Sequence, residues 1–142
     1  MKIRFYDSAD DSLLKFAVIV AMHGRKWVFC RHRDRNSYEL PGGHRENGED
    51  ILTAAARELR EETGAASFRL EPVCVYSATG RNRVNPGGEE CFGMLYHAEI
   101  ETFSGMPECE IASIELMDAL PENWTYPDIQ PFLIQEYLRR CK

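Results

Sequence analysis

The chain of 142 residues lacks several features that mark specialised protein classes. Its five cysteines are odd in number and scattered, and none forms a Cys-x-x-Cys pair, so neither a zinc site nor a disulfide framework is expected. Because reduced thiols are the norm in a cytoplasm, we expect a cytoplasmic protein. No apolar run approaches the roughly 18 residues of a membrane span, and Met1 to Phe5 lack the apolar core of a secretory signal.

An excess of positive charge is also missing. Lysine and arginine number 17 against 23 aspartates and glutamates, which gives a formal net charge of −6. This balance argues against an extended surface for nucleic acid. It does not exclude a small phosphorylated substrate, because local arginines or a bound metal can reverse the field within a cleft.

The composition predicts one globular domain over residues 1–142. Apolar residues make up 44% and charged residues 28%, both near globular averages, and the length is enough to bury a core. We find no internal repeat, linker or low-complexity tract. The sequence leaves open whether the domain is a monomer or a homodimer.

Hydrophobic patterning predicts a mixed α/β domain. A helix is expected over 50–63, with Glu49 or Asp50 near its cap and Gly64 as its stop. Its expected buried stripe is Leu52, Ala55, Ala56, Leu59 and Thr63. A second helix is expected over 127–140. The expected strands are 15–22, 26–31, 38–40, 68–79, 90–101 and 114–117.

Three carboxylates of the first helix carry the strongest chemical signal. Glu58, Glu61 and Glu62 stand at i, i+3 and i+4, so on a helix they share one face. Like charges at this spacing repel unless a positive charge lies among them. Hard cations such as Mg²⁺ prefer oxygen ligands and bind substrates that bring phosphate oxygens. The spacing therefore predicts a metal–phosphate site.

The same segment resembles the Nudix box, from Gly43 to Ala65, without a departure from its pattern. The matching residues are Gly43, Glu49, Arg57, Glu58, Leu59, Glu61, Glu62, Gly64 and Ala65. The flanking segments are similar to a small mutator-type (MutT-like) Nudix domain. This resemblance implies an α/β/α sandwich with a central mixed β-sheet. It also implies hydrolysis that depends on Mg²⁺, with Mn²⁺ as a substitute.

The resemblance assigns roles within the box. The Gly42 carbonyl, Glu61 and Glu62 are expected metal ligands. Glu58 is expected either to bind metal or to accept a proton from the attacking water, and which carboxylate is the base stays open. Arg57 is expected to pair with Glu49 and to orient the loop against the helix.

Family members often recruit one more acidic ligand from outside the box. Glu110 is the expected residue here, because it lies in a loop that leads into a strand and its offset of five residues before Glu115 resembles the mutator-type pattern. The neighbouring Glu108 is a second candidate in that loop. Glu89 and Glu90, beside a Gly-Gly pair, are the weaker alternatives.

Basic clusters and aromatic residues supply candidate substrate contacts. Arg31, Arg33 and Arg81 could bind phosphates, because the planar guanidinium donates two hydrogen bonds at once. Asp128 could accept from purine N–H donors. The aromatic candidates for stacking on a base are Phe5, Tyr76, Trp124 and Tyr126.

The resemblance implies an enzyme that cleaves a nucleoside diphosphate linked to another group. The expected substrate is a nucleoside triphosphate, such as an oxidised purine nucleotide like 8-oxo-dGTP, and the expected products are a nucleoside monophosphate and pyrophosphate. Three other enzyme substrates stay open: a nucleotide sugar, a dinucleoside polyphosphate and an RNA 5′ end. A regulatory domain that binds nucleotides without hydrolysis is the alternative from another class.

Overall fold

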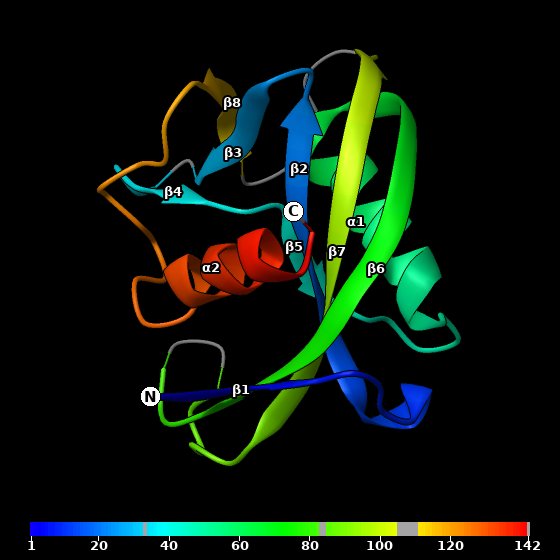
Figure 1. The fold of residues 1–142 in the computed structure, drawn as a ribbon, viewed down its shortest axis with the longest axis vertical. Coiled ribbons are helices and arrows are strands. Elements are labelled where there is room, and N and C mark those ends of the chain that lie inside the picture. The colour runs from blue at the N-terminus through cyan, green and yellow to red at the C-terminus, as the bar shows by residue number, and fades with distance from the viewer. Residues whose placement is uncertain (33, 83–84, 105–110, 142) are drawn as a thin grey trace.

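The computed structural model describes residues 1–142 except 33, 83–84, 105–110 and 142. Within these residues eight strands form one sheet, with one α-helix on each face (Figure 1). The elements are β1 (Lys2–Tyr6), the short 3₁₀ helix η1 (Asp11–Leu13), β2 (Leu14–His23), β3 (Lys26–His32), β4 (Tyr38–Glu39), β5 (Gly42–His44), α1 (Ile51–Thr63), β6 (Ala65–Thr79), β7 (Cys91–Phe103), β8 (Ile111–Met117) and α2 (Gln130–Arg140).

The sheet is mixed. Its main path runs β1-β6-β7-β2-β3-β4, while β5 pairs with β2 and β8 pairs with β3. The β2–β7 pair is parallel and the other pairs are antiparallel. The first half of β2 pairs with β5 and its last residues pair with β3. The segment that carries the box is thereby brought to the centre of the sheet.

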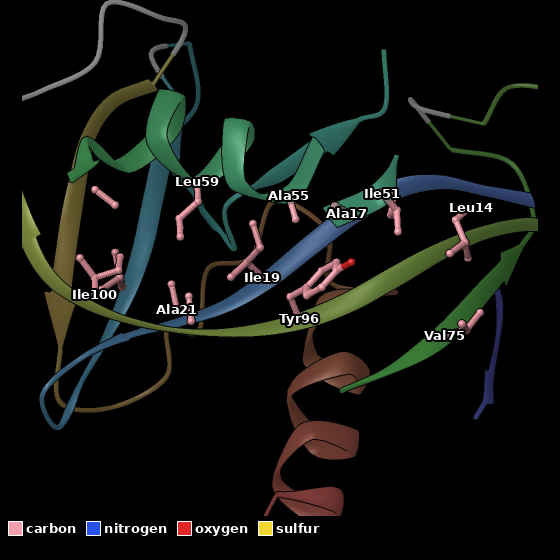
Figure 2. Packing of buried hydrophobic residues seen from close by; sticks show 13 residues of the cluster. Leu14, Ala17, Ile19, Ala21, Ile51, Ala55, Leu59, Val75, Tyr96 and Ile100 are labelled. Atoms are coloured by element: carbon pink, nitrogen blue, oxygen red, sulfur yellow. The ribbon is translucent and has the colours of Figure 1, made fainter. Parts of the chain in front are cut away.

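Alternation along β2 builds the two cores. Ala17 and Ile19 belong to the cluster under α1, which also contains Leu59 (Figure 2). Val20 belongs to the opposite cluster, which α2 covers with Leu133. Because successive strand residues point to opposite faces, one apolar strand serves both layers. The predicted α/β/α sandwich with a central mixed sheet is confirmed.

The limits of α1 follow from its caps. The Asp50 carboxylate accepts from Thr53 N at 2.8 Å, and Gly64 adopts a left-handed conformation with φ 75°. The predicted stripe was partly wrong, because Leu52 is 52% exposed and Ala56 is only half-buried. The inward row is Ile51, Ala54, Ala55, Leu59 and Thr63.

Several elements differ from the sequence prediction: η1 was not predicted, and β6 and β8 each begin three residues earlier than expected. Strands β1 and β5 were not predicted, because each depends on a distant partner: β1 pairs with β6, and β5 pairs with β2. Helix α2 begins at Gln130 and not at Pro127. The preceding residues form a turn in which Tyr126 O accepts from Ile129 N and Gln130 N. In the described part of the chain, no helix is long and apolar enough to cross a membrane.

An acidic side chain fastens the end of α2. Glu136 is buried and accepts from Arg139 Nε at 3.0 Å and from Arg140 Nε at 2.6 Å. Arg140 also reaches Asp7, just beyond β1, at 3.2 Å. These hydrogen bonds, with the charges of both arginines, lower the pKa of Glu136 to about 2. The ion cluster therefore connects the last helix to the first strand.

We predict that Glu136→Gln destabilises the fold in a pH-dependent way. A lowered folded-state pKa stabilises the protein above the unfolded value of about 4.5, and this contribution is lost as the pH falls towards about 2. The variant should lose about 1–2 kcal/mol of unfolding free energy at neutral pH, and less at about pH 3. Urea titrations followed by circular dichroism measure both values. Glu122→Gln, at an exposed position, is the control; a loss that does not change with pH would contradict the prediction.

Candidate functional site

The loop that carries the box is held against the sheet by β5. Gly42 and Gly43 pair with Val18 and Ala17 of β2. A Cβ on Gly42 would lie 2.3 Å from Ala17 O, and one on Gly43 would lie 2.5 Å from the Glu58 carboxyl carbon. A side chain at Gly42 would clash with the backbone of β2, and one at Gly43 would displace the Glu58 carboxylate, so the bare backbone lets Glu58 lie directly against the loop.

Arg57 is the centre of the polar contacts in the box. Its Nε and Nη2 donate to the two oxygens of Glu49 at 2.6 and 2.9 Å, which is a bidentate pair. Its Nη1 donates to Glu58 Oε1 at 2.7 Å, and Nη2 also reaches His44 O at 3.1 Å. The structure thus contains the expected Arg57–Glu49 ion pair. The hydrogen bonds from Arg57 and from Glu46 N lower the pKa of Glu49 to about 2.

The three helical glutamates differ in their surroundings. Glu61 is half-exposed and lies 3.4 Å from Arg57 Nη1. Glu62 Oε1 accepts from Gly42 N at 2.8 Å. Burial, followed by the charges of neighbouring carboxylates, raises the pKa of Glu62 to about 8, and burial also raises the pKa of Glu58. Carboxyl groups whose charged form is disfavoured by burial therefore gather where α1 meets the Gly42–Gly43 backbone.

The chemistry of these groups fits a hard divalent cation. All candidate donors are oxygens, and a cation would favour the charged form of buried carboxylates whose pKa is raised. In this conformation no three His, Cys, Asp or Glu side chains among the described residues converge closely enough to hold an ion. Arg57 binds one oxygen of Glu58 and Gly42 N–H binds one oxygen of Glu62, so the other oxygen of each carboxylate could bind a metal. The Gly42 carbonyl as a ligand stays a prediction.

A cavity of about 250 Å³ opens on the other side of the same loop. Gly42 and Gly43 form part of its wall, which places it beside the carboxylates. Aromatic rings and polar side chains share the remaining wall, chiefly Phe16, Tyr76, Tyr126, Glu39, Asn85 and Gln130. The sequence signalled only Tyr76 and Tyr126 of these six. Pro131, which favours the first turn of a helix, could have indicated that Gln130 lies at a helix start.

The other residues predicted to contact substrate differ in their burial and in their location relative to the cavity. Arg31 is half-buried on β3 and Arg81 is exposed in the loop after β6; neither forms an ion pair with any described residue. Asp128 lines a smaller recess of about 110 Å³, which shares Tyr126 with the main cavity. Arg33, Glu108 and Glu110 lie outside the described residues.

The remaining candidates are engaged elsewhere. Glu90 accepts from Ser77 Oγ at 2.7 Å and from Tyr6 Oη at 3.0 Å, so it fastens β1 to β6. Trp124 packs edge-on against Phe29 with ring centroids 5.4 Å apart. Phe5 packs against the same core cluster under α2. Trp124 and Phe5 are thus partly buried residues packed against the core, and their stacking on a base stays a prediction.

Comparison with known proteins identifies relatives over most of the chain. The model of the NUDIX domain matches residues 14–130. A Bacillus subtilis protein named "Putative 8-oxo-dGTP diphosphatase YtkD" is 32% identical over 124 residues, which cover 87% of this chain and 74% of YtkD. An RNA pyrophosphohydrolase of Caulobacter vibrioides is 45% identical over 56 residues. That match covers 37% of this chain and only 33% of the relative.

A solved structure shows the same fold. A variant of the Bacillus subtilis pyrophosphohydrolase BsRppH superposes with a TM-score of 0.77 at 23% identity, covering 96% of this chain and 90% of its own. The match of the family model agrees with the box and with the arrangement of β5 and α1 around it. The chain therefore belongs to the NUDIX domain family, the family of Nudix hydrolases that its box predicted.

Proposed function

We propose that this Nudix hydrolase is a Mg²⁺-dependent pyrophosphohydrolase that cleaves a nucleoside triphosphate to a nucleoside monophosphate and pyrophosphate. One observation carries the proposal. The Gly42–Gly43 backbone separates a carboxylate cluster on α1 from an aromatic-lined cavity, so a single loop adjoins both. A nucleotide needs both environments: oxygen ligands for the metal on its phosphates, and a flat apolar pocket for its base.

The residues of the box have different proposed roles in hydrolysis. Glu58, Glu61 and Glu62 would hold Mg²⁺, or Mn²⁺ as a substitute, together with the Gly42 carbonyl and Glu110. When bound, the ion neutralises charge on phosphate oxygens and polarises the phosphorus. A glutamate accepts the proton of the attacking water as the new oxygen–phosphorus bond forms and the anhydride bond breaks. Glu58 is either that base or a ligand, and Arg57 holds it beside the loop in both cases.

An oxidised purine nucleotide such as 8-oxo-dGTP is the proposed substrate. Support comes from the name of the relative YtkD and from the size and aromatic lining of the cavity. Arg31, Arg33 and Arg81 are the proposed phosphate contacts, and Asp128 is a proposed contact at the edge of the base site. We place the activity in the cytoplasm because of the cysteine pattern, in a monomer or a homodimer.

An RNA 5′ end is the second candidate substrate. The relatives named RNA pyrophosphohydrolase support it, although the match spans only a third of the Caulobacter protein. A short triphosphorylated RNA assayed beside free nucleotides discriminates the two. A domain that binds nucleotides without releasing pyrophosphate or phosphate would support the regulatory alternative.

We predict that turnover depends on a divalent ion. Activity on a panel of nucleoside triphosphates, including 8-oxo-dGTP, should disappear in chelator and return with Mg²⁺ or Mn²⁺, because the site offers oxygen donors. Pyrophosphate release measures the reaction. Full turnover in excess chelator would disprove the metal mechanism.

We predict that Glu61→Gln and Glu62→Gln each lower kcat by about 10²-fold or more, with weaker apparent Mg²⁺ affinity. In the Glu62→Gln variant the new amide oxygen can still accept from Gly42 N–H, so the melting temperature of that variant should not fall. Glu71→Gln, at an exposed position on β6, is the matched control. A variant that keeps more than about a tenth of the wild-type rate would remove that residue from its assigned role.

We predict that Arg57 and Glu49 act as one orienting pair. Arg57→Lys keeps the charge but cannot form the bidentate contact, so turnover should fall while the fold is retained. The double variant with Glu49→Gln should be no worse than the worse single variant, because both remove the same contact. Losses that add in the double variant would indicate independent roles.

We predict that Glu110→Gln lowers activity more than Glu108→Gln or Glu89→Gln does, with almost unchanged melting temperature. The comparison controls for the general loss of one negative charge near the site. A silent Glu110→Gln together with a crippling Glu89→Gln or Glu90→Gln would move the outer ligand to the loop before β7. For Glu90, the melting temperature must also be compared, because its contacts to Ser77 and Tyr6 are structural.

A further inference from the structure

Three buried polar side chains in the wall of the main cavity have hydrogen-bonding capacity that no described residue uses. Gln130, Tyr76 and Asn85 are 6%, 6% and 8% exposed, and all three line the cavity. The unused atoms of these side chains are not fully enclosed by protein, so they are accessible from the cavity. A ligand in the cavity can therefore supply their partners.

The orientation of the Gln130 amide is fixed by the backbone. Its Oε1 accepts from Leu40 N at 2.8 Å, and only an oxygen can accept from that N–H. The NH₂ group of Gln130 is therefore the end without a protein partner among the described residues. Gln130 offers the cavity donors only.

Asn85 is fixed in the opposite sense. Its Nδ2 donates to Glu89 O at 2.7 Å and to Gly80 O at 3.4 Å, and carbonyl oxygens can accept only from the nitrogen end. In the described part of the chain nothing donates to Asn85 Oδ1. Asn85 thus offers the cavity an acceptor.

Tyr76 adds a hydroxyl whose position is set by a glycine on the next strand. Tyr76 pairs with Gly93 across β6 and β7, and a Cβ on Gly93 would lie 2.7 Å from the tyrosine ring. The ring can lie there only because Gly93 has no side chain. The Tyr76 hydroxyl has no hydrogen-bond partner among the described residues, so it is available to donate or to accept.

We propose that Gln130, Tyr76 and Asn85 are the residues that select the nucleobase, and that they select a base with a carbonyl beside a ring N–H, as in guanine or 8-oxoguanine. A carbonyl oxygen has two lone pairs and can accept from both Gln130 and Tyr76, while the adjacent N–H donates to Asn85. Adenine has no carbonyl oxygen, and each of its ring nitrogens accepts only one hydrogen bond. The assignment rests on the proposed nucleotide substrate.

The location of these residues supports a base and not a phosphate. Rings of Phe16 and Tyr126 line the same cavity, as expected for stacking on a flat heterocycle. Glu39 also lines it, but forms an ion pair with Arg35 at 3.5 Å. A carboxylate in the wall disfavours phosphate. Asp128, the base contact predicted from sequence, lines the adjoining recess instead.

Gln130→Glu tests the proposal with one changed group. The new carboxylate can still accept from Leu40 N–H, but it replaces the donor in the cavity by an acceptor. Titration calorimetry with dGMP, 8-oxo-dGMP and dAMP, without and with Mg²⁺, avoids hydrolysis. Wild type should bind one of the two guanine nucleotides about tenfold or more tightly than dAMP, and Gln130→Glu should lose about tenfold of that affinity. Gln135→Glu, an exposed position on the same helix, should bind as wild type does.

Tyr76→Phe is a second test variant, chosen because it is not expected to destabilise the fold. A buried hydroxyl without a partner does not stabilise the fold, so the melting temperature should stay the same or rise, while guanine-nucleotide affinity falls several-fold. The proposal is overturned if neither variant changes the ratio of guanine to adenine affinity, if wild type prefers dAMP, or if none of the three nucleotides binds. Selective binding that depends on Gln130, without hydrolysis of any triphosphate, would uphold the base site and reject the proposed function. Hydrolysis of a triphosphate, together with nucleotide binding that does not depend on Gln130, would uphold the proposed function and reject the base site.

Discussion

The bidentate ion pair between Arg57 and Glu49 is the contact on which the site depends. A guanidinium fork bound to both carboxylate oxygens fixes direction as well as distance, which a single-point contact does not. Through its other nitrogen and through His44 O, Arg57 also fixes Glu58 and the end of β5. One side chain therefore sets the position of the loop, the helix and the Glu58 carboxylate relative to one another.

That rigid loop has two faces with opposite physical character. On the α1 side, Glu62 accepts from Gly42 N–H and burial raises its pKa, so this face gathers carboxyl groups whose charged form a cation would stabilise. On the α2 side, the same glycines line a cavity whose wall is mostly apolar or neutral and includes the rings of Phe16, Tyr76 and Tyr126. The absence of side chains at Gly42 and Gly43 keeps this partition one backbone thick. A nucleotide lying across it would meet the proposed metal ligands on one side and the proposed base pocket on the other.

The sequence was informative where function depends on neighbours in the chain. The carboxylates of α1, its Asp50 cap and its Gly64 stop are local features, because helical spacing and capping act over a few residues. The buried stripe of α1 was predicted less well from the sequence. Leu52 and Ile51 are adjacent and equally apolar, and only the packing of α1 on β2 decides which one is buried. Strands β1 and β5 were not predicted because each forms by pairing with a strand far along the chain.

By itself, the sequence determined the family, the residues of the box and the mixed α/β fold, since a motif of fixed spacing and a hydrophobic period are readable along one dimension. Only the tertiary structure decided which side chains share a cavity. Gln130, Asn85 and Tyr76 come from a helix start, a loop and a strand, and no spacing relates them. The Gln130 amide keeps an unused NH₂ group because its oxygen accepts from Leu40 N–H, and the Asn85 amide keeps an unused oxygen because its nitrogen donates to two loop carbonyls. Those contacts form only when β4, α2 and the loop before β7 are folded together.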